Sequence, residues 1–247
     1  PSRSSAASDV YKRQLNPKGK QMRSIRGNEI ALIPQEPMAA FSPVHTIGNQ
    51  LIENILLHQE VKESEAFEIA IERLKEVGIP NPEESMNRYS WELSGGLRQR
   101  AMIGMALTCN PSLLIADEPT TAIDVTTQAQ VLNLIRDLQQ KNKMSIIFIT
   151  HDLDEALRIG DNIAILRDGE IVQKGSPQEI VLKPSDGYVS DFIKDINRSR
   201  VLRVESIMNG EASESGPSLD KNTVIEDALQ VLNQSGEKSA RVVQDGE

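Results

Sequence analysis

Hydrophobic positions along the chain follow two patterns, one typical of helices and one typical of buried strands. Residues 64–78 and 126–142 repeat apolar side chains every three or four positions, as on one face of an amphipathic helix. Residues 29–37, 112–119 and 144–152 contain short, nearly continuous apolar runs. Such runs are typical of strands buried on both faces. The order strand, helix, strand therefore predicts an α/β fold with a parallel sheet and covering helices.

The pattern changes in the last third of the chain. Residues 162–175 predict two short strands joined by a tight Asp-Gly turn. The following Ser-Pro-Gln-Glu sequence predicts a helix that begins with a serine cap and a capping box. Residues 209–218 are rich in Gly, Ser and acids, which is typical of a linker. Beyond them, residues 223–236 predict a helix and residues 239–247 the start of a strand.

The composition of the chain argues against several classes of function. The 247 residues carry a net charge of −9, which argues against general nucleic-acid binding because that needs a basic face. Cys109 is the one cysteine, so neither a disulfide nor a cysteine-based metal site is expected within the chain. No apolar run approaches the roughly 18–20 residues that cross a bilayer, and the polar start lacks a secretory signal. These features predict a cytosolic protein that reaches a membrane only through a partner.

Several residues carry candidate chemistry but are ambiguous when taken singly. Ser94 is followed by Gly95 and Gly96 in front of a helical stretch; this is either an ordinary helix start or a site for a phosphate. Asp117 and Glu118 end an apolar strand, where paired acids are either solvated or serve a metal and a general base.

Two further residues lack a strong signal of their own. His151 follows another strand, and a histidine there is either a surface residue or a site residue. Gln35 has no independent signal.

Order and spacing make the combination specific. A Gln after the first strand (IPQEP), LSGG, a strand ending in Asp-Glu (LLIADEP), TTAID and a strand ending in His (ITHD) follow one another. From about Leu15 to Lys194 the sequence resembles the ATP-binding-cassette (ABC) ATPases. In that family these segments are the Q-loop, the signature motif, Walker B, the D-loop and the H-loop.

The resemblance implies roles for these residues in binding ATP and Mg²⁺. Asp117 would hold Mg²⁺ through water, and Glu118 would act as the general base on the attacking water. Gln35 would sense the γ-phosphate and the metal, and His151 would contact the γ-phosphate. Asp124 would lie at a subunit boundary.

The signature residues have a different place in the family. Ser94, Gly95 and Gly96 would reach the γ-phosphate of ATP that is bound by the opposite subunit. The resemblance therefore implies a dimer of ATP-binding subunits.

The P-loop pattern G-x-x-x-x-G-K-[ST] does not occur in the 247 residues, where Gln21 follows the one Gly-Lys pair. The expected fold is therefore a P-loop NTPase-like ABC ATPase domain that lacks its first strand and its P-loop. We expect an amino-terminally truncated ATPase that is inactive alone but presents its signature face to a complete subunit.

Four regions are expected along the chain. Residues 1–14 form a disordered or foreign lead-in. Residues 15–195 form the partial ABC ATPase domain, with a helical signature subdomain at about 45–100. Residues 196–218 form a linker, and residues 219–247 resemble the start of an α+β CBS domain.

Two parts of the chain resemble two different classes of importer ATPase. Residues 15–150 are similar to dipeptide, oligopeptide and nickel importer ATPases, whereas residues 151–247 are similar to glycine betaine/proline importer ATPases. Both imply a motor at the cytoplasmic face of the membrane, with integral permease subunits and a separate solute-binding protein as partners. A non-catalytic fragment and a soluble ABC ATPase outside transport remain the alternatives.

Overall fold

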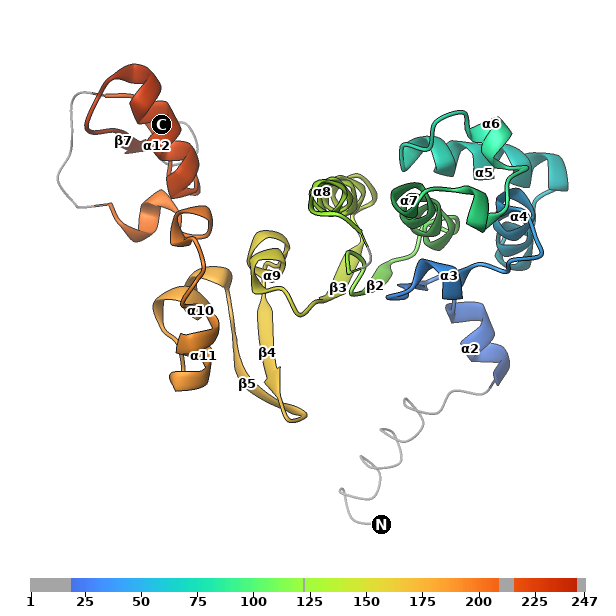
Figure 1. The fold of residues 1–247 in the computed structure, drawn as a ribbon, viewed down its shortest axis with the longest axis horizontal. Coiled ribbons are helices and arrows are strands. Elements are labelled where there is room, and N and C mark those ends of the chain that lie inside the picture. Colours follow the sequence, from blue (N-terminus) through green and yellow to red (C-terminus); the bar gives the residue numbers. More distant parts are fainter. Residues whose placement is uncertain (1–18, 122, 209–215, 244–247) are drawn as a thin grey trace, which may run out of the picture. The chain divides into compact units, whose positions relative to one another are not determined.

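The computed structural model describes residues 19–121, 123–208 and 216–243 (Figure 1). The chain divides into two compact units, Pro1–Thr150 and His151–Glu247. The described elements of the first unit are, in chain order, α2 (Gly19–Ile25), β1 (Ile30–Ile33), α3 (Pro37–Ala40), α4 (Ile47–His58), α5 (Glu63–Glu76), α6 (Pro82–Ser85), η1 (Ser90–Glu92), α7 (Gly95–Ala106), β2 (Leu113–Asp117), α8 (Val125–Asn142) and β3 (Ser145–Ile149).

The strands of the first unit form a parallel sheet in the order β1-β2-β3. Ile33 of β1 lies opposite Ala116 of β2, which lies opposite Phe148 of β3. The three apolar runs thus form the predicted parallel sheet. Since the strands are parallel, their carboxyl ends lie at the same edge, and the residues that follow β1 and β2 meet there.

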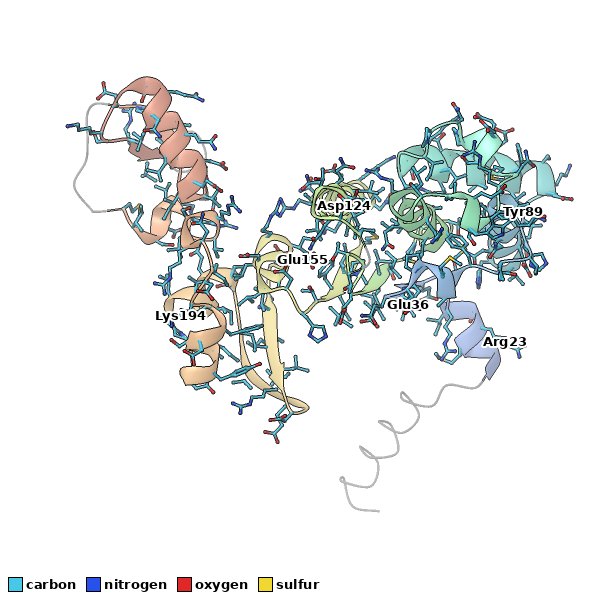
Figure 2. All side chains as sticks on the ribbon, viewed as in Figure 1. Arg23, Glu36, Tyr89, Asp124, Glu155 and Lys194 are labelled. Atoms are coloured by element: carbon cyan, nitrogen blue, oxygen red, sulfur yellow. The ribbon has the colours of Figure 1, made fainter. Side chains whose placement is uncertain are left out.

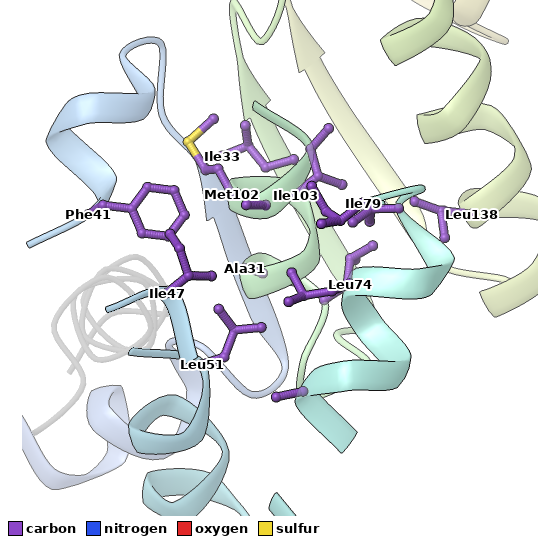
Figure 3. Packing of buried hydrophobic residues seen from close by; sticks show 14 of the residues in the cluster. Ala31, Ile33, Phe41, Ile47, Leu51, Leu74, Ile79, Met102, Ile103 and Leu138 are labelled. Carbon is purple, nitrogen blue, oxygen red and sulfur yellow. The ribbon is translucent and has the colours of Figure 1, made fainter. Parts of the chain in front are cut away.

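One face of this sheet packs against helices. Figure 1 shows α7 and α8 on the same side of the strands, and buried residues of both helices share a core with Ile33 and Leu114. Met102 and Ile103 of α7 lie next to Ile33 in the packed core (Figure 3). The predicted apolar face of α5 is also confirmed, because the following residues are all buried: Ala66, Ala70, Leu74 and Val77.

The second unit contains a different set of elements. These are α9 (Leu153–Ile159), β4 (Ile163–Arg167), β5 (Glu170–Gly175), α10 (Pro177–Leu182), α11 (Gly187–Phe192), η2 (Arg198–Arg200), η3 (Val204–Ser206), β6 (Ser218–Asp220), α12 (Ile225–Ser235) and β7 (Arg241–Val243). β4 and β5 pair antiparallel, and Asp168 and Gly169 between them have φ of +53° and +82°. The predicted hairpin is therefore confirmed, with the left-handed turn that an Asp-Gly pair favours.

The end of the chain combines two parallel strands with one helix. β6 pairs parallel with β7, and α12 connects them. Within the predicted linker, Val201, Leu202 and Val204 are buried, because this stretch supplies apolar side chains to neighbouring clusters. Residues 209–215, the predicted lead-in 1–14 and residues 244–247 lie outside the described part of the chain. None of the described helices is long and apolar enough to span a bilayer.

Candidate functional site

Gln35 and Glu118 meet at the carboxyl edge of the sheet. Gln35 comes two residues after β1, and Glu118 directly follows the neighbouring β2. The Gln35 side-chain amide donates a hydrogen bond of 2.6 Å to Oε2 of Glu118. The Thr121 hydroxyl donates a second bond, of 2.9 Å, to the same oxygen. The structure thus brings together two of the residues selected from the sequence, and it adds Thr121, which the sequence did not indicate.

Asp117 occupies the last position of β2, beside Glu118, and is partly buried. Among the described residues, no three His, Cys, Asp or Glu side chains group closely enough to hold a metal ion alone. Mg²⁺ usually takes only one or two carboxylates from a protein and completes its shell with water and nucleotide phosphates. The donors present, the Asp117 carboxylate and the Gln35 amide oxygen, therefore fit Mg²⁺ that arrives with a nucleotide.

Glu118 has a left-handed backbone. Its φ is +44°, a conformation that costs a non-glycine residue on the order of 1–3 kcal/mol. Its N–H donates to the carbonyl of Ile149 at the end of β3, at 2.9 Å. The carbonyl of the next residue, Pro119, accepts a hydrogen bond from the side chain of Gln99 in α7. Gln99 is only 1% exposed, so the left-handed turn is held on both sides.

The amino-terminal tip of α7 is open. Ser94 is the N-cap residue, and its hydroxyl accepts from the Leu97 N–H at 3.4 Å. Ser94 and Gly95 are exposed, and a Cβ built on Gly95 would meet no atom within 4 Å. The first turn contains no acidic residue. Free N–H groups, the positive end of the helix dipole and open space together suit an anion such as phosphate.

Asp124 is the N-cap residue of α8 (Figure 2 labels Asp124), and Thr127 in the first turn of α8 lies close to Gly96 of this tip. Its carboxylate accepts from the Thr127 N–H at 3.0 Å and from the Thr127 hydroxyl at 2.7 Å. The hydroxyl bond first, and the backbone bond second, hold the pKa of Asp124 below its usual value. A Cβ on Gly96 would lie 2.9 Å from Cγ2 of Thr127, so Gly96 allows α7 and α8 to approach closely.

His151 is placed differently from the other candidates. It follows β3 after one intervening residue, is exposed, and is the first residue of the second compact unit. All the other selected residues belong to the first unit. The contact between His151 and a γ-phosphate stays a prediction.

Sequence reasoning missed Gln99, Thr121 and Thr127. One signal was available for Gln99, which shares the helical spacing i, i+3, i+4 with the apolar Met102 and Ile103. A polar residue on an apolar helix face is expected to have a buried partner. Thr121 and Thr127 had no comparable signal.

Comparison with known proteins supports the resemblance. The ABC transporter family model matches residues 6–121. A probable peptide ABC transporter ATP-binding protein, y4tR of Sinorhizobium fredii, is 46% identical over 191 residues, 76% of this chain and 57% of that protein. The oligopeptide transport ATP-binding protein OppD of Bacillus subtilis is 47% identical over 68% of this chain and 47% of that protein.

Two further similarities agree. The glutathione import ATP-binding protein GsiA of Salmonella typhimurium is 46% identical over 76% of this chain and 30% of that protein. A dimeric post-hydrolysis structure of the ATP-binding cassette MJ0796, bound to ADP and Pi, aligns with a TM-score of 0.58 and 26% identity. It covers 66% of this chain and 68% of that one. The chain thus spans only 30–57% of these three sequence relatives. Its homologues among ABC transporter ATP-binding proteins include peptide, oligopeptide and glutathione import ATPases.

Proposed function

We propose that this chain is part of the ATP-hydrolysing motor subunit of an ABC importer of the peptide class. The observation that carries the proposal is the Glu118 carboxylate at the carboxyl edge of the sheet, held by Gln35 at 2.6 Å and Thr121 at 2.9 Å. A carboxylate fixed in this way is suited to accept a proton from an attacking water molecule. The names of the relatives support the peptide class.

The proposed reaction is hydrolysis of ATP with Mg²⁺. Asp117 and Gln35 would hold the metal, which would neutralise charge on the phosphates. Glu118 would take the proton of the attacking water, and His151 would help to order that water. Ser94, Gly95 and Gly96 would bind the γ-phosphate of the nucleotide held by a second ATP-binding subunit, and Asp124 would lie at that boundary.

The proposed partners are permease subunits in the membrane and a separate solute-binding protein. The motor would lie at the cytoplasmic face of the membrane through these contacts. Because the 247 residues contain no P-loop pattern, we propose that the chain by itself binds ATP weakly and presents its signature face to a subunit that has one.

The decisive experiment is ATP hydrolysis by the assembled complex with Glu118→Gln. We expect a loss of at least about 100-fold, because the amide cannot accept the proton. Glu72→Gln is the matched control, since Glu72 is exposed on α5. Hydrolysis that survives Glu118→Gln would contradict the proposal.

The substrate class needs a separate measurement. We expect the complex in proteoliposomes to take up a labelled oligopeptide when ATP is inside. Uptake of glycine betaine in place of the peptide would overturn the peptide class and leave the ATPase proposal intact.

A further inference from the structure

Gln99 joins the open tip of α7 to the turn that carries Glu118. It lies on the same helix as the tip, about one and a half turns from the cap Ser94. Its side chain is 1% exposed and donates to the carbonyl of Pro119, the residue after Glu118. A buried amide that reaches across 20 positions of the chain fixes the place of the carbonyl that it binds.

The turn at Glu118 needs such support. A φ of +44° persists in a glutamate only where the surroundings hold it. Before the turn, the Glu118 N–H is bound to Ile149 of β3; after it, the Pro119 carbonyl is bound to Gln99. Gln35 and Thr121 then orient the carboxylate itself. Removal of the Gln99 donor would free one side of the turn and leave the sheet in place.

We propose that Gln99 is a positioning residue for Glu118: its buried amide locks the left-handed turn and couples the orientation of the general base to the position of α7. The inference rests on the proposed function of Glu118. The tip of α7 would face the nucleotide of the second subunit. Binding of that nucleotide at the tip would therefore affect the orientation of Glu118 in the same chain.

The first test measures the turn without ATP. In Gln99→Met, which keeps the length of the side chain but lacks a donor, we expect the hydrogen-exchange protection of the Glu118 amide to fall at least about tenfold. The amide of Leu114, near the start of β2, should change by less than about twofold. Gln140→Met on α8 is the matched control, because Gln140 is exposed. Equal loss at Leu114 and Glu118, or no loss at Glu118, would overturn the proposal.

Gln99→Glu provides a pH-dependent rescue. A buried carboxyl is neutral at pH values where an exposed one is ionised, and only its neutral form donates a hydrogen bond. Protection of the Glu118 amide, corrected for intrinsic exchange, should therefore be near that of the wild type at about pH 5 and low at about pH 8. Gln99→Met should show no such change. Absence of the rescue would argue against a hydrogen bond as the cause.

The second test measures catalysis in the assembled transporter. Gln99→Met should lower kcat for ATP hydrolysis at least about tenfold while KM for ATP changes by less than about twofold. An unchanged kcat would overturn the positioning role. If wild-type hydrolysis does not depend on Glu118, the proposed function fails, and the exchange results still decide whether Gln99 locks the turn.

Discussion

Ser94 and Ser176 both cap a helix, but the side chains that form hydrogen bonds at the two helix starts differ. At α10, the Ser176 hydroxyl donates to the Glu179 carboxylate at 3.0 Å, and that carboxylate also accepts from the Ser176 N–H at 2.8 Å. At α7, the Ser94 hydroxyl accepts a single long bond of 3.4 Å, and no acid follows in the first turn.

The comparison separates a structural cap from a candidate binding site. An acid in the first turn satisfies the free N–H groups and the helix dipole from within the chain. At the tip of α7 the Ser94 hydroxyl binds one N–H, that of Leu97, and no acid in the first turn complements the helix dipole. The tip also has two glycines, of which Gly95 has open space around it. A helix start that is left incomplete in this way is suited to an anion from outside.

The largest effect is expected from adding an acid to the open tip. Gly95→Glu places a carboxylate in the first turn of α7, where nothing lies within 4 Å of the new Cβ. We expect the free energy of unfolding to rise by about 0.3–1 kcal/mol through the helix dipole. ATP-dependent association with a second ATP-binding subunit should weaken at least about tenfold, because the carboxylate repels phosphate.

Sedimentation with and without ATP would measure that association. Gly95→Gln is the control, because its side chain has the size of the glutamate without the charge. Undiminished association of Gly95→Glu would mean that the tip of α7 does not bind phosphate.

The second prediction compares the two glycines of the tip. Gly96→Ala would place a Cβ 2.9 Å from Cγ2 of Thr127, whereas Gly95→Ala meets nothing. We expect Gly96→Ala to lower the free energy of unfolding by about 1–3 kcal/mol through overpacking between α7 and α8. Gly95→Ala should raise it by about 0.5–1 kcal/mol. Urea unfolding followed by circular dichroism tests both; equal effects would contradict the close approach at Gly96.

Much of the architecture could be predicted from the sequence. The three apolar runs gave the parallel strands, the helical spacing gave the buried face of α5, and the Ser-x-x-Glu pattern gave the cap of α10. Parallel order alone implied that residues after β1 and β2 meet, and Gln35 and Glu118 do. These features depend on local spacing and on the rules of sheet topology.

Other features of the site could not be predicted. The left-handed φ of Glu118 carries no sequence signal, because glutamate rarely adopts it and no glycine marks the turn. The bonds from Thr121 and Gln99 depend on side-chain directions within packed structure. Such contacts follow from how α7 lies on the sheet, which spacing along the chain does not specify.

The third prediction compares how much the two serine caps contribute to the free energy of unfolding. Ser176→Ala should lower the free energy of unfolding by about 1–2 kcal/mol, because it removes both the N-cap acceptor and a bond to Glu179. Ser94→Ala should cost about 0.5 kcal/mol, since it removes the N-cap acceptor alone and no bond to a first-turn acid. Both can be measured by urea unfolding. A larger cost at Ser94 would show that its role is that of an ordinary structural cap.

The smallest effect is expected from pH at the filled helix start. The Ser176 N–H first, and the Ser176 hydroxyl second, hold the pKa of Glu179 below its usual range. A lowered pKa in the folded state means that the carboxylate stabilises the fold fully above its unfolded pKa of about 4.3. That contribution is lost as pH falls through the lower folded pKa. Glu179→Gln should therefore reduce the urea midpoint slightly at pH 7 and progressively less below about pH 4.

The tip of α7 has no carboxylate in its first turn, so Ser94→Ala should lower the free energy of unfolding by the same amount at both pH values. A pH-dependent cost at Ser94 would mean that an acid from elsewhere fills that tip, and the contrast between the two helix starts would not hold.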